Sequence, residues 1–420
     1  MTTTINNEHK KLNVPNSTDK GNVIRNVPNL RFPEFEEEWE NCKLGDACNV
    51  FMCKRILASQ TNTDGGVPFY KIGTIGSTPD TYISKELFDD YKEKYNYPHK
   101  GEVMITCAGT VGKCVVYDGK DAYYQDSNIV WIDNPSQNIS NGFLYHLMAN
   151  VDWRKLNSTT IIRIYNDDLK NLKLNYPKKE EQQKISKLLT LLDERIATQN
   201  KIIDKLQSLI KGIADNILDN PLWKKTYLRS FMQFFSTNSL SWEQLSYEEG
   251  EIRNLHYGLI HGFLTRGINS VSLPMIKNEA IPKQYTLCQV GDVAFADASE
   301  DTGEIAKSVE FVDTIEGDTI CGLHTIHGRD IKNRTVVGFK GFAFNSRYFH
   351  NQIKRLAQGT KVFSITANNL SSCYVYLPDL EKQKAIVKLL RSYEKQLIIG
   401  RMILKQYEKQ KQYLLRQMFI

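Results

Sequence analysis

The segment Glu180–Asp219 reads EEQQKISKLLTLLDERIATQNKIIDKLQSLIKGIADNILD, and the rest of the chain is arranged around it. It contains no proline and a single glycine, Gly212. Its apolar residues recur in alternating steps of four and three, a heptad pattern that predicts one long helix packed along its length against another helix. One polar residue, Gln199, interrupts the pattern. The predicted seam residues of this segment are Ile185, Leu189, Leu192, Ile196, Ile203, Leu206 and Ile210.

The partner helix is predicted at the C-terminus, where the pattern is repeated. Adding 201 to each number gives a second seam, in which Gly400 stands in the place of Gln199. The sequences that start the two helices match at the same offset, because Tyr176–Gln182 reads YPKKEEQ and Leu377–Gln383 reads LPDLEKQ. A constant offset over this span indicates a duplicated unit of one lobe and one helix. The second seam consists of Ile386, Leu390, Tyr393, Leu397, Leu404 and Tyr407.

The composition is that of a globular protein. With 420 residues, of which 41% are apolar and 24% charged, the chain is long enough for two or three domains. No apolar run approaches the roughly 20 residues of a membrane span, and the N-terminus lacks the apolar core of a signal peptide. The eight cysteines include no Cys-x-x-Cys pair, which favours free thiols in a reducing cytoplasm over disulfides or a zinc site. We therefore expect a cytoplasmic protein without a bound metal.

The formal net charge of +6 is unevenly distributed. The last forty residues hold ten Lys and Arg against three Asp and Glu, whereas the two lobes are close to neutral. Such lobes can bind an anion such as DNA only through local basic patches rather than through a broad positive field. For the basic C-terminal helix, a solvated face and a position near phosphates or an acidic partner stay open as alternatives.

Five segments follow from these patterns. A polar leader at 1–29, expected to be poorly ordered, precedes lobe one at 30–178, a central helix at 179–219, lobe two at 220–379 and a C-terminal helix at 380–420. Short strand-like runs between turn residues predict a mixed α/β fold for lobe one. The runs expected as strands are Val67–Ile75, Gly101–Cys107, Cys114–Tyr117, Ser127–Ile132, Ile161–Ile164 and Leu172–Tyr176, and Phe143–Leu156 is expected to be an amphipathic helix.

Lobe two is expected to repeat this plan with different side chains. The offset between matching segments varies, as insertions in loops would make it, whereas the helix starts have stayed alike. We interpret this as one scaffold that presents two different surfaces. The matching segments are Trp242-Glu243 with Trp39-Glu40, Leu255–Ile260 with Tyr70–Ile75, and Gly291–Phe295 with Gly101–Ile105.

Three features together resemble the specificity subunit of type I restriction–modification systems. They are the motif LRFPEF at Leu30–Phe35 ahead of Trp39, the Pro-x-x-Glu-x-Gln sequences at Pro177 and Pro378, and the alternation of lobe and helix. The resemblance covers nearly the whole chain from Leu30 onward. It implies two target-recognition domains, each reading one half of a split DNA sequence. It also implies that the two helices pack as an antiparallel coiled coil whose length sets the spacer between the half-sites.

The same resemblance implies partners and no catalytic activity of this chain. Two methyltransferase subunits are expected to dock on the helices and lobes, and restriction subunits to join that core. S-adenosylmethionine is expected on the methyltransferase subunits and no cofactor on this chain. Because the two lobes differ in sequence, the half-sites should differ as well. The predicted target is therefore bipartite and asymmetric double-stranded DNA.

Loops that combine glycine with hydroxyl and cationic side chains are the candidates for DNA contact. Glycine lets the backbone approach closely, and the side chains donate to phosphates and base edges. Gln125 and Asn128 have side chains that suit adenine, and Arg163 one that suits guanine. Such loops can also be ordinary hairpin turns. The candidates are Lys71, Gly73, Thr74, Ser77, Gly109, Thr110, Lys113, Gln125, Asn128, Thr159, Thr160 and Arg163 in lobe one, and His256, Tyr257, Gly258, Thr302, Thr360 and Lys361 in lobe two.

Enzymatic alternatives fail on specific residues. Gly109–Lys113 resembles part of a phosphate loop, but Cys107 replaces its first glycine and Cys114 its Ser or Thr. The Asn-Pro-Pro-aromatic motif of adenine methyltransferases is missing, and His324 and His327 could share a helix face but have no apparent third metal ligand. One non-enzymatic alternative stays open, a scaffold whose two lobes bind other proteins across a coiled coil. Neutral lobes fit that alternative, whereas the helix-start motifs favour DNA recognition.

Overall fold

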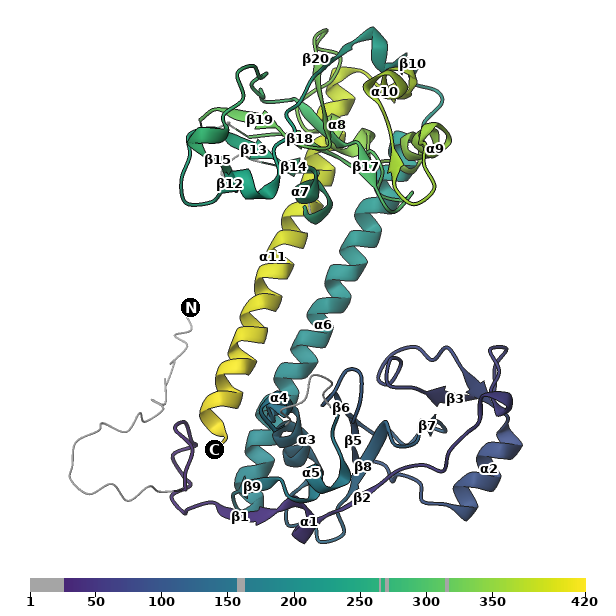
Figure 1. Ribbon diagram of the computed structural model, residues 1–420, viewed down its shortest axis with the longest axis vertical. Coiled ribbons are helices and arrows are strands. Elements are labelled where there is room, and N and C mark those ends of the chain that lie inside the picture. The colour runs from purple at the N-terminus through teal and green to yellow at the C-terminus, as the bar shows by residue number, and fades with distance from the viewer. Residues whose placement is uncertain (1–25, 157–162, 264–265, 269–271, 314–316) are drawn as a thin grey trace, which may run out of the picture. The chain divides into compact units, whose positions relative to one another are not determined.

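The computed structural model describes residues 26–156, 163–263, 266–268, 272–313 and 317–420. Thr159, Thr160, most of the leader and the start of the strand expected at Ile161–Ile164 lie outside these residues. The chain divides into two compact units. Unit one consists of the residues up to Ala197 together with Lys405–Ile420, and unit two consists of Thr198–Leu404. Each unit contains one lobe and a part of both long helices (Figure 1).

The two long helices predicted by the heptad pattern are confirmed as α6 (Lys179–Leu218) and α11 (Leu380–Met418). In unit one, Met418 at the end of α11 shares a buried core with Ile185 near the start of α6. In unit two, Leu390 near the start of α11 shares a buried core with Leu218 at the end of α6. Since start lies against end in both units, the helices pack antiparallel. Within the described residues, no helix is both long and apolar enough to cross a bilayer.

The predicted seam residues are buried or half-buried. Gln199 and Gly400, which interrupt the two seams, are in contact, because Gln199 Nε2 donates to the Gly400 carbonyl at 3.1 Å. Seven seam residues are buried, namely Ile185, Leu189, Leu192, Ile203, Ile386, Leu390 and Leu397. Six are half-buried, namely Ile196, Leu206, Ile210, Tyr393, Leu404 and Tyr407.

Lobe one is built from two small sheets and a strand pair. Antiparallel strands β1 (Glu40–Lys43) and β9 (Lys173–Tyr176) bring the start and the end of the lobe together at the base of α6. One sheet has the order β2 (Asn49–Phe51), β8 (Ile129–Asp133), β5 (Val103–Thr106), β6 (Cys114–Val116). The other has the order β4 (Tyr82–Ile83), β3 (Val67–Tyr70), β7 (Tyr123–Tyr124), with β3 and β7 parallel. The helices of the lobe are α1 (Leu44–Ala47), α2 (Lys85–Lys94), α3 (Asn141–Asn150), α4 (Trp153–Leu156) and α5 (Asn166–Lys170).

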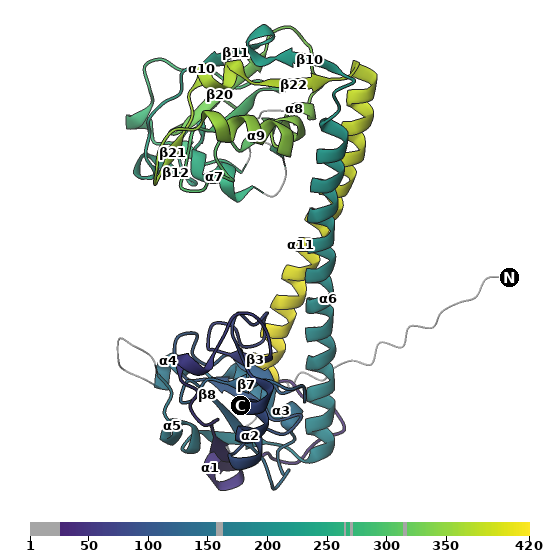
Figure 2. The same ribbon diagram turned by 90° about the vertical axis from the view of Figure 1, so that its right-hand side faces the viewer.

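Lobe two has the same plan with extra strands, and several of its elements are labelled in Figure 2. The strand pair is β10 (Lys224–Tyr227) with β22 (Tyr374–Leu377). One sheet has the order β11 (Met232–Phe235), β20 (Thr325–Asp330), β16 (Val293–Ala296), β18 (Ser308–Phe311), β14 (Gly267–Ile268). The other has the order β12 (Leu245–Ser246), β15 (Met275–Ile276), β13 (Arg253–Leu255), β19 (Thr319–Cys321), with β13 and β19 parallel. A further pair is β17 (Ala298–Ser299) with β21 (Phe363–Ser364), and the helices are α7 (Tyr257–Gly262), α8 (Phe339–Ala343), α9 (Arg347–Leu356) and α10 (Ala367–Ser372).

Several expected elements differ from those observed. The strand expected at Val67–Ile75 ends at Tyr70, and the residues after it form turns, because Thr74 Oγ1 accepts a hydrogen bond from the Lys71 N–H at 3.0 Å. The helix expected at Phe143–Leu156 is two helices, since the backbone leaves the helical region at Val151. Ile164 lies in no strand. These boundaries depend on turn hydrogen bonds that periodicity does not reveal.

One match between the lobes was wrong. The register pairs Glu40 with Tyr176 in lobe one and Lys224 with Leu377 in lobe two. Since Tyr176 and Leu377 hold equivalent places before the long helices, the counterpart of Trp39 is Trp223 and not Trp242. The shared Trp-Glu dipeptide therefore does not identify equivalent positions in the two lobes, whereas the strand pairing does.

The matching helix starts have a structural reason, which is a buried glutamine in each. Gln182 and Gln383 are 0% exposed. Gln182 Nε2 donates to the carbonyls of Pro177 and Asn138, and its Oε1 accepts from the Ser140 N–H at 2.7 Å. Gln383 makes the same three hydrogen bonds, with the carbonyls of Pro378 and Arg334 and the N–H of Val336. Each glutamine therefore fastens a loop of its lobe to the first turn of its long helix.

The LRFPEF motif fastens the start of lobe one to both long helices. Arg31 donates from Nε and Nη2 to the two carboxylate oxygens of Glu181 at 2.7 Å each, and Glu181 is 1% exposed. The Leu30 N–H donates to the carbonyl of Gln417 on α11 at 2.8 Å. Lys184 pairs with Glu34 on the same face. This motif is thus a structural strap within unit one.

Candidate nucleic-acid interface

Segments of lobe one that are far apart in sequence meet where β3, β5 and β7 end. The Cys107 N–H donates to the Asn128 carbonyl at 2.8 Å, and the Ile164 N–H donates to the Cys107 carbonyl at 2.9 Å. The Gln125 N–H donates to the Tyr70 carbonyl at 2.9 Å. These hydrogen bonds bring the candidate loops of lobe one together. We call residues 71–77, 107–113, 125–128 and 163–165 the lobe-one loop cluster.

Side chains add further links within the lobe-one loop cluster. Lys113 Nζ donates to the Ile75 carbonyl at 2.6 Å, so the hairpin after β5 is held against the turns after β3. The Ile72 N–H donates to Gln125 Oε1 at 3.4 Å. Lys113 and Gln125 therefore have structural partners as well as half-exposed positions.

Other candidates of this cluster differ in how free their polar groups are. The Ser77 hydroxyl donates to the Thr74 carbonyl at 2.8 Å, so Ser77 and Thr74 both shape the turn. Lys71 pairs with Asp80 at 2.9 Å, but both side chains are largely exposed, which makes the pair weak in water. Lys71 can therefore exchange this partner for a phosphate. The exposed candidates are Gly73, Ser77, Gly109 and Thr110.

The hairpin between β5 and β6 needs its glycines. Gly109 and Gly112 have positive φ values of 65° and 80°. A Cβ at position 112 would lie 2.1 Å from Trp153 Cδ1, so any side chain there would clash. The segment is a strand–turn–strand hairpin, whereas a phosphate loop joins a strand to a helix. Thr110 sits exposed at its tip.

Arg163 and Tyr165 form an edge of the lobe-one loop cluster that the sequence reasoning captured only in part. The Arg163 guanidinium lies 5.9 Å from the centroid of the Tyr165 ring, and its Nη2 donates to the Ser127 carbonyl at 3.5 Å. Tyr165 is 62% exposed. An exposed ring beside a guanidinium suits stacking on a base or a sugar. In the sequence, the only indication that Tyr165 is a candidate for stacking is its position two residues after Arg163.

Lobe two builds its cluster with the same backbone hydrogen bonds. The Asp297 N–H donates to the His324 carbonyl at 3.0 Å, and the Ile365 N–H donates to the Asp297 carbonyl at 2.9 Å. The Gly322 N–H donates to the Leu255 carbonyl at 2.9 Å. Asp297 and His324 thus hold the places of Cys107 and Asn128 in lobe one. We call residues 256–258, 297–303, 322–324 and 359–365 the lobe-two loop cluster.

In the lobe-two loop cluster, His256 is the buried ring beside Tyr257. His256 is 3% exposed, its Nδ1 accepts from the Gly258 N–H at 3.2 Å, and its ring lies 4.4 Å from that of Trp242. Burial lowers the pKa of His256, and His324 lowers it further. His256 therefore caps α7 as a neutral ring, and the polar groups nearer the surface are those of Tyr257 and His324.

His324 was missed as a DNA-contacting candidate. It has a positive φ of 53°, and its Nδ1 lies 3.0 Å from Asp297 Oδ1, with about half of the side chain exposed. The sequence reasoning placed it on a helix face with His327, which was wrong, because His324 lies in the turn before β20 and His327 within that strand. From the sequence, His324 could have been identified only by aligning it with Asn128 of lobe one. The different loop lengths of the two lobes conceal that alignment.

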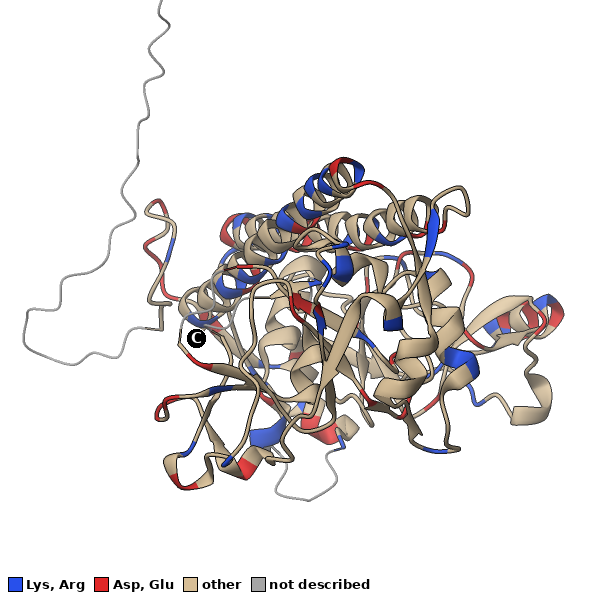
Figure 3. Ribbon diagram, turned by 90° about the horizontal axis from the view of Figure 1, so that it is seen from above, with Lys and Arg blue, Asp and Glu red and all other residues tan. Residues whose placement is uncertain are grey.

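The remaining candidates of lobe two lie on exposed loops. Thr302, Thr360 and Lys361 are exposed, and the Thr302 carbonyl accepts from His350 Nε2 at 2.9 Å. Pairing of β17 with β21 brings the loops 297–303 and 359–361 together. Lys and Arg are interspersed with Asp and Glu along the ribbon (Figure 3).

The family follows from a comparison with known proteins. A family model described as "Type I restriction modification DNA specificity domain" matches residues 36–208 and 322–409. These ranges include both helix starts with their buried glutamines and the whole of the lobe-one loop cluster. The chain belongs to the type I restriction–modification DNA specificity family.

Individual relatives agree with this assignment. A relative from Haemophilus influenzae, named as a type I restriction enzyme specificity subunit, is 47% identical to this chain over 169 residues. The match covers 40% of this chain and 43% of that protein. The chain thus spans less than half of that relative. A relative from Methanocaldococcus jannaschii, named as the type I restriction enzyme MjaX specificity subunit, is 24% identical to this chain. The match covers 92% of this chain and 94% of that protein. The crystal structure of the S subunit from M. genitalium shares the fold, with a TM-score of 0.57, 16% identity and coverage of 94% of this chain and 99% of that one.

This specificity subunit therefore has two lobes of one fold that carry two different loop clusters. Backbone hydrogen bonds place the clusters, and the side chains on them differ: Cys107 and Asn128 in one, Asp297 and His324 in the other. The cluster in each lobe combines exposed hydroxyl groups, a cationic side chain and an aromatic ring, which are the groups that donate to phosphates and stack on bases.

Proposed function

We propose that this specificity subunit reads a bipartite, asymmetric DNA target, with one half-site bound by each loop cluster. The observation that carries the proposal is the identical set of backbone hydrogen bonds beneath two unlike sets of side chains. A shared framework presents each cluster in the same way to a duplex, whereas Asn128 and His324 offer different donors and acceptors to base edges. Two unlike half-sites follow.

Phosphate contacts by the two clusters supply the affinity in this proposal, and their base-edge contacts supply the selectivity. Lys71 and Arg163 in lobe one and Lys361 in lobe two are cations beside exposed hydroxyl or amide groups. Contacts of this kind fix the position of a protein on DNA, and base-edge contacts then discriminate sequences. Because both lobes are close to neutral, the isolated subunit should bind DNA weakly and depend on its partners for affinity.

The two long helices act as a spacer in the proposed complex. A helix of 40 residues is about 60 Å long at roughly 1.5 Å per residue. We propose that this length determines how far apart the two half-sites lie. Half-sites read from one side of a duplex lie about one helical turn apart or a multiple of it. The spacer between the half-sites is therefore set by helix length.

The partners we propose are methyltransferase subunits, which bring S-adenosylmethionine, and restriction subunits for defence of the host. This chain supplies no catalytic group. A stripe of apolar side chains supports docking on α11, since Ile398, Ile399, Met402 and Ile403 are 42%, 47%, 63% and 38% exposed. Exposed apolar stripes of this kind mark protein interfaces.

A gel-shift experiment tests the proposal. The chain is assembled with its methyltransferase partner and S-adenosylmethionine and mixed with fragments of genomic DNA at two salt concentrations. We expect sequence-selective retardation that weakens as salt increases. A stable complex that retards no fragment selectively would instead favour the alternative, a scaffold whose neutral lobes bind other proteins.

A further inference from the structure

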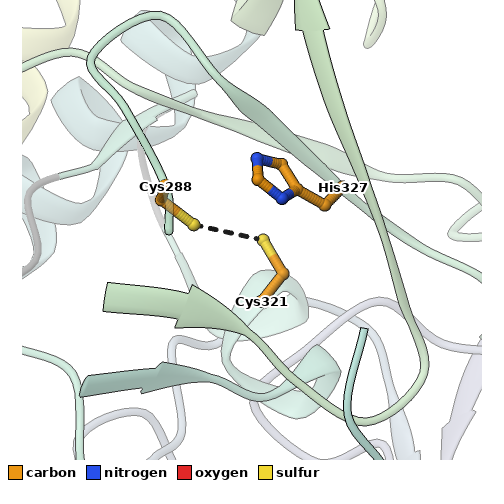
Figure 4. A group of neighbouring side chains, drawn as sticks. All are labelled: Cys288, Cys321 and His327. Atoms are coloured by element: carbon orange, nitrogen blue, oxygen red, sulfur yellow. Dashed lines mark hydrogen bonds between the residues drawn. The ribbon is translucent and has the colours of Figure 1, made fainter. Parts of the chain in front are cut away.

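Three side chains with metal-binding atoms meet inside lobe two. Cys288 precedes β16, Cys321 ends β19 and His327 lies on β20 (Figure 4). Their ligand atoms all lie within 4.8 Å of one another, and the residues are 7%, 2% and 1% exposed. The sequence predicted no metal because it has no Cys-x-x-Cys pair and no apparent third ligand for His324 and His327. The two cysteines come instead from other elements, 33 residues apart.

The two sulfur atoms are spaced as a tetrahedral ion would space them. Cys288 Sγ and Cys321 Sγ are 3.6 Å apart. Two sulfur ligands at about 2.3 Å from zinc, at a tetrahedral angle, are roughly 3.8 Å apart. The backbone holds this separation, because the Cys288 N–H donates to the Thr319 carbonyl at 2.8 Å and Cys321 is paired with Leu255 in the sheet.

His327 is oriented for a metal by a carboxylate on its far side. His327 Nε2 lies 2.7 Å from Asp292 Oδ2. Arg329 holds both oxygens of Asp292, at 2.8 and 2.7 Å, and balances its charge. A carboxylate that accepts the Nε2–H leaves the lone pair of a neutral imidazole on Nδ1, which is how histidine ligands of metals are commonly fixed. Figure 4 shows the ring beside the two sulfur atoms.

We propose that Cys288, Cys321 and His327 bind one zinc ion, with Asp292 as the positioning residue for His327. Sulfur and imidazole ligands suit zinc and disfavour magnesium or calcium. On binding, each thiol releases its proton to solvent, two Zn–S bonds form, and Nδ1 donates its lone pair. The two thiolate charges cancel the charge of the ion, so the buried group stays neutral. Water takes the fourth position, which the described His, Cys, Asp and Glu residues leave open.

Zinc at this place would hold a loop that matters for recognition, a consequence that rests on the proposed function. Cys321 and His327 flank the turn that carries His324. An ion that joins the end of β19 to β20 fixes this turn and, with it, the lobe-two loop cluster. Metal binding itself does not depend on DNA recognition, so the two proposals can fail separately.

The test uses the full chain purified without chelator, and it compares Cys321→Ser with Cys373→Ser. Cys373 is a matched control, since it is another buried free thiol of lobe two, outside the group. We expect about one zinc per chain by elemental analysis in the parent and in Cys373→Ser, and loss of most of it in Cys321→Ser. Replacement of zinc by cobalt should give a thiolate-to-cobalt charge-transfer band, which Cys288→Ser should weaken.

A second measurement covers the case in which Cys321→Ser does not fold. A strong chelator should lower the melting temperature of the parent chain, and added zinc should restore it. Three results would overturn the proposal: parent protein that takes up neither zinc nor cobalt, equal metal content in Cys321→Ser and Cys373→Ser, or a Cys288–Cys321 disulfide in metal-free protein prepared without oxidant.

Discussion

Gln199 Nε2 donates a hydrogen bond of 3.1 Å to the carbonyl of Gly400, its counterpart in the second repeat. A Cβ at position 400 would lie 3.0 Å from that nitrogen and 3.5 Å from Ile203 Cγ1. Both heptad seams are therefore interrupted at one close contact, where an added Cβ would require the Gln199 amide to move by a few tenths of an ångström.

Replacing this glycine should destabilise the helix pair. Gly400→Leu is expected to lower the free energy of unfolding by about 1–3 kcal/mol, because the added side chain meets Gln199 and Ile203. Gly212→Leu is the control, since nothing lies within 4 Å of a Cβ there, and it should raise that energy by roughly 0.5–1 kcal/mol through helix propensity. Urea unfolding of both variants measures the difference. Shifts of the same sign would contradict the close approach.

The buried glutamine of each helix start should be costly to remove. Gln182→Leu leaves the Ser140 N–H and the Asn138 carbonyl without their partner, so we expect a loss of about 2–4 kcal/mol in unfolding free energy. Gln396→Leu, on an exposed position of α11, should change it by less than about 0.5 kcal/mol. Urea titrations decide between these values. Equal effects of the two substitutions would mean that Gln182 does not fasten the lobe to its helix.

Stability should fall as the pH falls below neutrality because of His146. This residue of α3 is 1% exposed, and burial lowers its pKa from 6.5 to about 4, while Asp193 raises the pKa and Lys411 lowers it by smaller amounts. In the unfolded chain the His146 imidazole binds a proton near pH 6.5, whereas in the folded chain it does so only near pH 4. The contribution of His146 to the free energy of unfolding is therefore fully present above pH 6.5 and is lost as the pH falls toward 4. Across this window the loss amounts to about 3 kcal/mol at most.

His146→Leu removes that titrating group. Urea unfolding at several pH values between neutral and mildly acidic should therefore show a shallower decline for His146→Leu than for the parent chain. The comparison concerns the slope with pH, because the substitution also changes packing at all pH values. Identical slopes would show that other groups control acid sensitivity.

The lobe-two loop cluster gives a prediction for specificity. His324→Ala in the assembled methyltransferase should change or relax the half-site read by lobe two and lower methylation of the parent target about fivefold or more, since a base contact contributes roughly 1–3 kcal/mol. The other half-site should stay unchanged. Lys332→Ala is the control, because Lys332 is exposed beyond the opposite end of β20 from His324. Methylome sequencing of cells carrying each variant provides the readout, and unchanged half-sites in His324→Ala would remove His324 from the reading surface.

The spacer prediction concerns both long helices together. Deleting the heptads Ile196–Ile202 and Leu397–Ile403 keeps the seams in register and shortens each helix by about 10 Å. The spacer in the methylated target should then shorten by about three base pairs at 3.4 Å each, with both half-sites retained. A new half-site beside an unchanged spacer would rule out helix length as the ruler.

Local sequence patterns were sufficient to predict the two long helices. The alternating steps from Ile185 to Ile210 and from Ile386 to Tyr407 predicted α6 and α11 almost to the residue, because helix periodicity and the start and stop signals around Pro177 and Pro221 are local. Shorter strands were less predictable. The strand expected to reach Ile75 stops at Tyr70, since hydrogen bonds of the following turns outweigh the apolar pattern.

The sequence by itself determined the duplication, the paired helices and the family of this protein, because each appears as a repeated pattern within continuous stretches of the sequence. The tertiary structure alone decided which loops meet. Cys107 contacts Asn128 and Ile164, and Cys288 contacts Cys321, through strands that bring distant residues within hydrogen-bond distance. No spacing rule gives such meetings, because loops of different length in the two lobes lead to the same backbone contacts, and only the folded sheets fix which side chains share a surface.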